Sequence, residues 1–193
     1  MLYSSEELKN RVLHFFPNLS DAALDEFLSI CKYKKAGNKE IILKGGSTRK
    51  NVILLLSGSA RAFSLDKEGK ELNNFMRYEG YLIADAKVFG DEVQILEVES
   101  IGEVHYLKFN IGKLEELSYE SKELLSFYLD FLKEIILTLS HRVGTFVTMN
   151  PKERYEDLLR WNPKYLHSAF DKDVASFIGI KPITLYRIKK EVE

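Results

Sequence analysis

The sequence predicts an α+β fold: an N-terminal double-stranded β-roll (jelly roll), one long helix and a small all-helical C-terminal domain. Short β-rich runs alternate with glycine turns over residues 33–109. An apolar stripe with alternating spacings of four and three begins at Leu125, which is typical of a long packed helix. Two short amphipathic segments joined by a glycine turn close the 193-residue chain. We therefore expect the roll and its leading helices over residues 1–117, the long helix over 118–149 and the helical domain over 150–193.

Composition limits the functions that the chain can have. The net charge is −1, with 45% hydrophobic and 30% charged residues, so any attraction for nucleic acid has to come from a local patch. Cys31 is the only cysteine, which rules out an internal disulfide, a four-cysteine zinc site and a cysteine-held iron–sulfur cluster. The N-terminus lacks a signal-peptide pattern, and no apolar run approaches about 18 residues. We expect a cytoplasmic protein that has no membrane partner.

Two helices are expected before the roll. Ser4 and Glu7 have the spacing of a capping box for the first helix. Ser20 or Asp21 can cap the second helix, which runs to Cys31.

The β-rich runs predict the roll itself. They read KEIILKG, KNVILLLSGSARAFSL, KELNNFMRYEGYLIA, EVQILEVES and EVHYLKF. Turn signals separate them at Gly37, Gly45, Gly46, Gly58, Gly69, Gly80, Gly90 and Gly102. Strands at this spacing favour a small barrel or a jelly roll.

The long helix carries the clearest periodic signal. Seven apolar residues recur at spacings of 4-3-4-3-4-3, namely Leu125, Leu129, Leu132, Ile136, Leu139, Val143 and Phe146. This spacing places them on one seam, which we expect to be the interface between two copies of the chain. A second row covers an adjacent face and can pack against the roll of the same chain: Leu124, Tyr128, Phe131 and Ile135. The alternative is a single core helix that is buried on both faces.

A proline marks the end of the long helix and the start of the next one. The long helix is expected to end near Met149, because the residue before Pro151 is pushed out of the α region. Asn150, Pro151 and Glu153 then have the positions of a cap, a first-turn proline and a capping-box acid.

The end of the chain predicts a helix-turn-helix. In a 20-residue frame from Asp171 to Lys190, positions 5, 9, 15 and 18 hold Ala175, Gly179, Leu185 and Ile188. Ala175 lets two helices cross closely, and Gly179 can take the positive φ of a tight turn. The second helix of such a motif can enter the major groove of DNA. An ordinary helical hairpin that closes a core is the alternative.

The side chains expected to meet DNA belong to the turn and the second helix: Lys181, Ile183, Thr184, Tyr186, Arg187, Lys189 and Lys190. Arg187 is the candidate for a bidentate bond to guanine. Lys181 and Thr184 are the candidates for phosphate contacts. Ile183 and Tyr186 can contact a thymine methyl group or a sugar.

The positive charge at this end of the chain is local and dilute. Lys181, Arg187, Lys189 and Lys190 supply it, and Glu191 and Glu193 weaken it. Arg187 can instead pair with Glu191, four residues further on, in a solvated contact worth roughly a few tenths of a kcal/mol.

These features together resemble the Crp/Fnr family of bacterial transcription regulators. The resemblance rests on a helical lead, a roll containing LLLSGSARAF, a long striped helix, and NPKERYEDLL before VASFIGIKPITLYRIKK. It covers nearly the whole chain and is most specific over residues 151–190. It implies a homodimer on a pseudo-palindromic double-stranded DNA site, an unidentified small-molecule effector in the roll, and RNA polymerase as a further partner. Family members with a full winged domain continue into trailing strands, and we expect no full wing here.

The region that binds cyclic nucleotides in the family departs from the family pattern. It reads LIADAKVFGDEVQILEVES, with Ala84 and Asp85 where a Gly-Glu pair would bind ribose and Glu92 near the arginine that would bind the cyclic phosphate. A carboxylate there repels a phosphate, and no arginine occurs in this region. We expect no control by cyclic AMP through this cassette, unless Lys87 replaces the arginine.

Two other classes of protein remain as alternatives. A cupin-type enzyme also uses a roll, but it gathers several histidines, and here His105 alone lies on a predicted strand. The four histidines are scattered without metal-ligand spacing: His14, His105, His141 and His167. The second alternative is a dimeric effector-binding or protein-interaction module with little DNA affinity. We expect no catalytic residues, no metal ligands and no cofactor.

Overall fold

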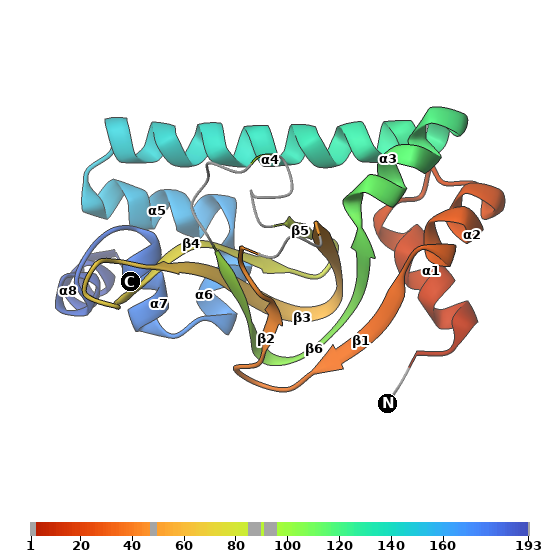
Figure 1. The fold of residues 1–193 in the computed structure, drawn as a ribbon. Coiled ribbons are helices and arrows are strands. Elements are labelled where there is room, and N and C mark those ends of the chain that lie inside the picture. Colours follow the sequence, from red (N-terminus) through yellow and green to blue (C-terminus); the bar gives the residue numbers. More distant parts are fainter. Residues whose placement is uncertain (1–2, 47–49, 85–89, 91–95, 193) are drawn as a thin grey trace.

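The computed structural model describes residues 3–46, 50–84, 90 and 96–192, and it confirms the mixed α+β architecture (Figure 1). The strands are β1 (Lys32–Ala36), β2 (Ile41–Leu43), β3 (Asn51–Leu65), β4 (Glu71–Tyr78), β5 (Leu82–Ala84) and β6 (Glu97–Asn110). The helices are α1 (Ser5–Phe15), α2 (Asp21–Ser29), α3 (Ile111–Glu120), α4 (Lys122–Thr148), α5 (Pro151–Trp161), α6 (Pro163–Ser168), α7 (Asp171–Phe177) and α8 (Pro182–Val192). Helices α1 to α3 lie at one end of the sheet, and α5 to α8 gather at the other end (Figure 1).

The described strands form one antiparallel sheet that curls into a roll. Strands β1, β6, β3 and β4 are neighbours in that order, while β2 also pairs with β6 and β5 with β3. Strand β6 corrects one prediction. The sequence predicts two strands separated by a turn at Gly102, but a single strand runs through this residue. Gly102 has a φ of 75°, and the pairing of β3 with β6 shifts between Ser57 and Ser59, so the strand bends here instead of ending.

Strand β3 explains how the roll is joined to its helices. Val52, Leu54 and Leu56 belong to a core shared with α1 to α4, whereas Ile53 and Leu55 belong to the interior of the roll. All five side chains are fully buried. Because successive residues of a strand face opposite sides, one continuous apolar run fills both cores. Burial at about 25 cal/mol per Å² of apolar surface then holds the sheet and the helices together.

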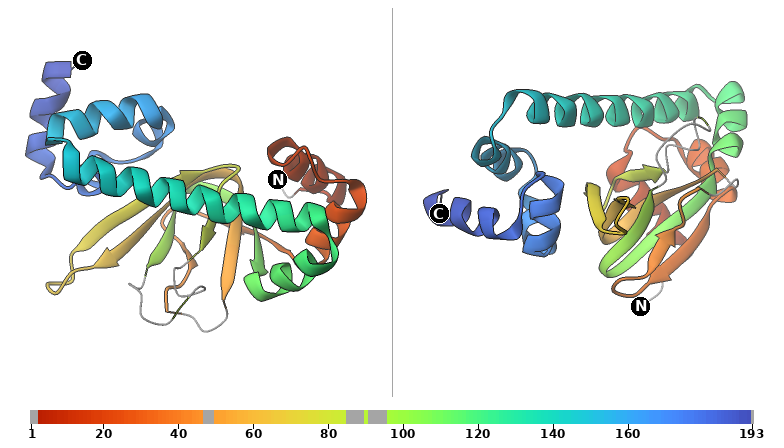
Figure 2. Two further views of the ribbon diagram at one scale, coloured as in Figure 1. Left: turned by 90° about the horizontal axis from the view of Figure 1, so that it is seen from above. Right: turned by 60° about the vertical axis from the view of Figure 1, so that its left-hand side comes forward.

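Helix α4 runs along the molecule and connects its two ends (Figure 2). It begins after Ser121, whose hydroxyl accepts a hydrogen bond from the Leu124 N–H, and it ends at Thr148. The expected packing of its second apolar row against the roll is confirmed, since Leu124 and Phe131 are buried in the core shared with the roll. Neither α4 nor any other helix among the described residues is both long and apolar enough to cross a membrane.

The capping signals read from the sequence are confirmed. Ser4 and Glu7 form a reciprocal capping box at α1, and Asn150 and Glu153 form one at α5. Ser20 caps α2 by accepting a hydrogen bond from the Ala23 N–H. The short helix α6, which follows α5 directly, has no counterpart in the sequence-based prediction.

The C-terminal helices share a core with the sheet. The buried members of this core are Met76, Tyr155, Leu158, Tyr165, Val174, Ala175, Ile178, Leu185 and Ile188. All of them come from α5 to α8 and their connections except Met76, which lies on β4. The C-terminal part is therefore packed against the β3–β4 hairpin in this conformation.

Candidate nucleic-acid interface

Helices α7 and α8 form the predicted helix pair. Ala175 is fully buried in the core that also contains Leu185. Gly179 has a φ of 73°, as the predicted turn requires. The Ile180 N–H donates to the Ala175 carbonyl at 2.9 Å and closes the turn, and α8 then begins at Pro182. A proline suits this position because its fixed φ is already helical and a first-turn N–H has no partner to lose.

Replacing Gly179 by alanine is expected to lower the free energy of unfolding by about 2–3 kcal/mol. One contribution is the positive φ, which a side chain disfavours. The other is steric, because a Cβ atom at this position would lie 2.7 Å from Cε1 of Phe146. Urea unfolding of the variant measures the loss.

Gly69→Ala is the matched control for this variant. Gly69 has a similar φ of 78°, but a Cβ atom there would meet nothing within 4 Å. We expect it to lose about 1–2 kcal/mol from the backbone alone. Equal losses in the two variants would contradict a packing role for Gly179 against Phe146.

The predicted DNA-contacting residues lie mainly on one exposed face. Ile183 and Tyr186 have 58% and 53% of their surface exposed, although both are large hydrophobic side chains. Lys181 and Arg187 are also exposed, and Thr184 is half-buried. Among the residues that the structure describes, Arg187 has no ion-pair partner. The alternative pairing with Glu191 is not present, and the Glu191 carboxylate instead lies 3.3 Å from Nζ of Lys152.

Two of the predicted residues have partners within the chain. Lys189 is half-buried, and its Nζ lies 2.6 Å from Oδ1 of Asp171 at the start of α7. The Nζ of Lys190 lies over the ring of Tyr186, 4.6 Å from its centroid. Lys189 therefore links the two helices of the motif, whereas Lys190 remains on the exposed face beside Tyr186.

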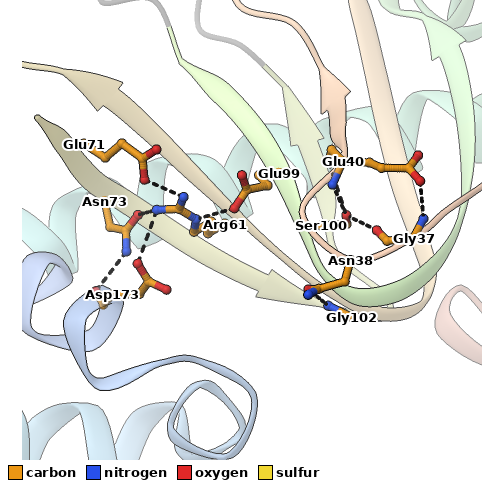
Figure 3. A network of polar contacts seen from close by, with 10 residues as sticks. All are labelled: Gly37, Asn38, Glu40, Arg61, Glu71, Asn73, Glu99, Ser100, Gly102 and Asp173. Atoms are coloured by element: carbon orange, nitrogen blue, oxygen red, sulfur yellow. Dashed lines mark hydrogen bonds and ion pairs between the residues drawn. The ribbon is translucent and has the colours of Figure 1, made fainter. Parts of the chain in front are cut away.

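A buried arginine connects the roll to the helix-turn-helix, and sequence reasoning missed it (Figure 3). Arg61 on β3 donates from Nε to Glu99 at 2.9 Å and from Nη2 to Glu71 at 2.5 Å. Its Nη1 lies 3.3 Å from Oδ1 of Asp173 on α7 and 3.0 Å from the Asn73 side-chain oxygen. One guanidinium thus holds three carboxylates from two parts of the chain.

The electrostatics of this network favour the charged arginine. Only 6% of the Arg61 side chain is exposed. The exposed fraction is 7% for the Asp173 side chain and 16% for the Glu99 side chain. Burial works to lower the pKa of Arg61, but the hydrogen bonds to Glu71 and Glu99 and the charge of Asp173 together raise it. Without Arg61, the two most buried carboxylates would have no cation beside them.

Asn73 on β4 completes the contact between the two parts. Its side-chain N–H donates to the backbone carbonyl of Asp173 at 2.9 Å, and its backbone N–H donates to the Ser176 hydroxyl at 2.9 Å. The hairpin is therefore hydrogen-bonded to the first helix of the motif as well as packed against it through Met76.

Two arginines tie the end of α4 to the same motif. Arg154 donates to the carbonyls of Met149 and Ile178, both at 2.9 Å, and so bridges the segment after α4 and the turn after α7. The Arg142 guanidinium lies 4.3 Å from the ring centroid of Phe177. Burial lowers the pKa of Arg142 to about 10, and the neighbouring Arg154 adds to this effect. These contacts attach the end of α4 to the helix-turn-helix in this conformation.

The predicted seam of α4 is mostly unburied in the single chain. Six of its members are exposed, namely Leu125, Leu129, Ile136, Leu139, Val143 and Phe146, and Leu132 is half-buried. Phe146 also contacts the chain's own turn at Gly179 and lies beneath Arg142 and Arg154. A contiguous apolar stripe of this kind usually marks an interaction surface.

The region expected to bind an effector is only partly described. Ala84 ends β5 and is half-buried against the core shared with the helices. Asp85, Lys87 and Glu92, on which the cassette argument depends, lie outside the described residues.

The strand histidine is engaged by side chains of the roll. His105 Nδ1 lies 2.5 Å from the Tyr33 hydroxyl, and its Nε2 lies 3.2 Å from Glu103. Within the described part of the chain, no three His, Cys, Asp or Glu side chains come together in a way that could hold a metal ion.

The arrangement of roll, long helix and helix-turn-helix is that of the Crp/Fnr regulators. A Crp/Fnr-family transcriptional regulator from Eubacterium rectale is 12% identical, with a TM-score of 0.68 over 93% of this chain and 86% of its own. FixK2 from Bradyrhizobium japonicum is 11% identical, with a TM-score of 0.69 over 84% of each chain. The c-di-GMP-responsive global regulator CLP from Xanthomonas campestris is 12% identical, with a TM-score of 0.67 over 90% of this chain and 91% of its own.

These solved structures confirm the resemblance at the level of the fold. Two of these neighbours, CLP and the Eubacterium rectale protein, are described as regulators of gene expression or transcription. Comparisons with protein-family models and with curated proteins find no match.

Proposed function

We propose that this protein is a homodimeric, sequence-specific DNA-binding transcription regulator of the Crp/Fnr type. Residues 1–117 would sense an effector, residues 118–149 would form the dimer interface and residues 150–193 would bind DNA. On the resemblance alone, the proposal also takes RNA polymerase and an unidentified small molecule as partners.

The exposed face of α8 is the observation that carries this proposal. Ile183 and Tyr186 are exposed beside Arg187, which has no ion-pair partner among the described residues. Apolar and cationic groups together suit the major groove, where guanine offers acceptors and thymine offers a methyl group. A hairpin that only closed a core would have no need to present these groups to solvent.

Arg187→Ala is expected to lower affinity by about 1–3 kcal/mol and to relax the preference at one base pair of each half-site. The reason is that a bidentate bond to guanine reads a base edge. Binding-site selection from a random duplex pool, run on the wild-type protein and the variant, measures both effects.

Lys181→Ala is the comparison for this experiment. A phosphate contact positions the protein on DNA but does not distinguish one base from another. This variant should therefore lower the affinity for all DNA sequences alike, and it should reduce the slope of log affinity against log salt concentration by about one. Wild-type affinity together with an unchanged base preference in Arg187→Ala would remove Arg187 from the interface.

We also propose that cyclic nucleotides do not control this protein through the segment that binds them in the family. Because Ala84, Asp85 and Glu92 provide no cation for a cyclic phosphate, calorimetry with cyclic AMP or cyclic GMP should detect no saturable binding in the micromolar range. Tight binding would contradict this. If it were lost in Lys87→Gln, Lys87 would be the replacement cation.

A further inference from the structure

A groove of about 660 Å³ lies between the β3–β4 hairpin and the helix-turn-helix. Lys70 and Glu71 line it from the hairpin, Lys172 lines it from α7, and Lys181 and Pro182 line it from the turn and the start of α8. The sensor part and the C-terminal part of the chain thus form opposite walls of one surface feature.

The charge of this groove is positive. The side chains of Lys70, Lys172 and Lys181 are exposed, and none of the three has an ion-pair partner among the described residues. The groove is also lined by Arg61 and by its partners Glu71 and Asp173, so that four cations and two carboxylates leave the lining with a net charge of +2. Three exposed ammonium groups therefore line a groove whose lining side chains have a net positive charge.

The hairpin wall is held in a fixed position. The Arg61 network and the hydrogen bonds from Asn73 join it to α7 (Figure 3). Met76, on strand β4 of the same hairpin, is buried in the C-terminal core. The hairpin is therefore attached to the C-terminal helices by ion pairs, hydrogen bonds and apolar packing. These contacts fix the position of Lys70 beside the turn of the helix-turn-helix.

We propose that the β3–β4 hairpin is part of the DNA-contact surface, and that Lys70 binds the phosphate backbone beside Lys172 and Lys181. This inference rests on the proposed function, because it places the hairpin next to a recognition helix that is itself bound to DNA. The groove is open and cationic, and its lining includes Lys181, the predicted phosphate contact, which suits a phosphodiester strand. The roll would then have two roles: it would contact DNA directly, and it would signal to the helix-turn-helix domain.

The test compares two lysines of the same hairpin turn. Lys70→Gln removes a charge that lines the groove, whereas Lys67→Gln removes one from an exposed residue of the same turn that does not line it. Affinity for a duplex enriched by the wild-type protein is measured over a range of salt concentrations. Lys70→Gln should reduce the slope of log affinity against log salt by about 0.9, which is about fivefold in affinity at 0.15 M salt, and Lys67→Gln should change the slope much less.

The possible outcomes separate this inference from the proposed function. An unchanged slope in Lys70→Gln, together with a reduced slope in Lys181→Gln, would remove the hairpin from the interface and leave the proposed function standing. Equal reductions in Lys70→Gln and Lys67→Gln would indicate a general charge effect and would also overturn the inference. If the wild-type protein enriches no duplex, the proposed function fails and the inference fails with it.

Discussion

Replacing Arg61 by methionine is expected to lower the free energy of unfolding by about 3–5 kcal/mol. Methionine keeps most of the apolar stem, so the main change is the loss of the guanidinium. Asp173 would then be left as a buried carboxylate, and Glu99 as a half-buried one, without the cation that both now contact. Chemical unfolding at one fixed protein concentration measures the loss, since dimerisation would make stability depend on concentration.

A second variant tests the cause of this loss. Arg61→Met combined with Asp173→Asn removes one of the uncompensated charges, and it should recover part of the lost stability. An exposed ion pair contributes at most about 1 kcal/mol to stability. A loss of stability below this value in Arg61→Met would contradict a structural role for the network.

Leu132→Asp combined with Leu139→Asp is expected to abolish dimerisation. The two substitutions would place four carboxylates in an apolar interface, and each unpaired buried charge costs several kcal/mol. Because about 1.4 kcal/mol is a factor of ten, the dissociation constant should rise by at least about 100-fold. Sedimentation equilibrium measures the change, with circular dichroism to establish that the variant is folded.

Leu137→Asp is the matched control on the same helix. Leu137 is also an exposed apolar residue, but it lies outside the 4-3 spacing of the seam. We expect this variant to remain dimeric. A folded Leu132→Asp/Leu139→Asp variant that is still a dimer would assign the stripe to some other contact.

Local patterns were sufficient to predict the main elements of the fold. The capping boxes at Ser4 and Asn150 and the positive φ at Gly179 follow from residues a few positions apart. Gly102 shows the limit of such patterns. A glycine with positive φ fits a turn and a bend in a strand equally well, and only the pairing of β6 with β3 decides between them.

The contact between the roll and the helix-turn-helix could not be predicted in this way. Arg61 and Asp173 are 112 positions apart, and nothing in the sequence around either residue indicates that the two meet. Met76 also fits the pattern of its own strand, although it is buried in the C-terminal core. Such contacts depend on how α4 places the two parts of the chain, and no local spacing encodes this. One signal was available: Arg61 and Arg77 lie within β-rich runs, where a charge needs a partner if it is buried.

The candidate DNA interface could be predicted only in part, because it too depends on how the two parts of the chain are placed. The exposed face of α8 follows from helical spacing, and Lys181 could be assigned to it from the sequence. Lys70 could not, because its place beside Lys181 is set by the docked hairpin. The pairing of Lys189 with Asp171 was missed for a related reason, since it depends on the angle between α7 and α8.

The decisive measurement is the selection of bound duplexes from a random DNA pool by the wild-type protein, with and without metabolites from a cell extract. We expect enrichment of sequences with two related half-sites in inverted orientation, their centres about 34 Å or one helical turn apart. Failure to enrich any sequence under either condition would contradict the assignment as a DNA-binding regulator and would favour a dimeric interaction module.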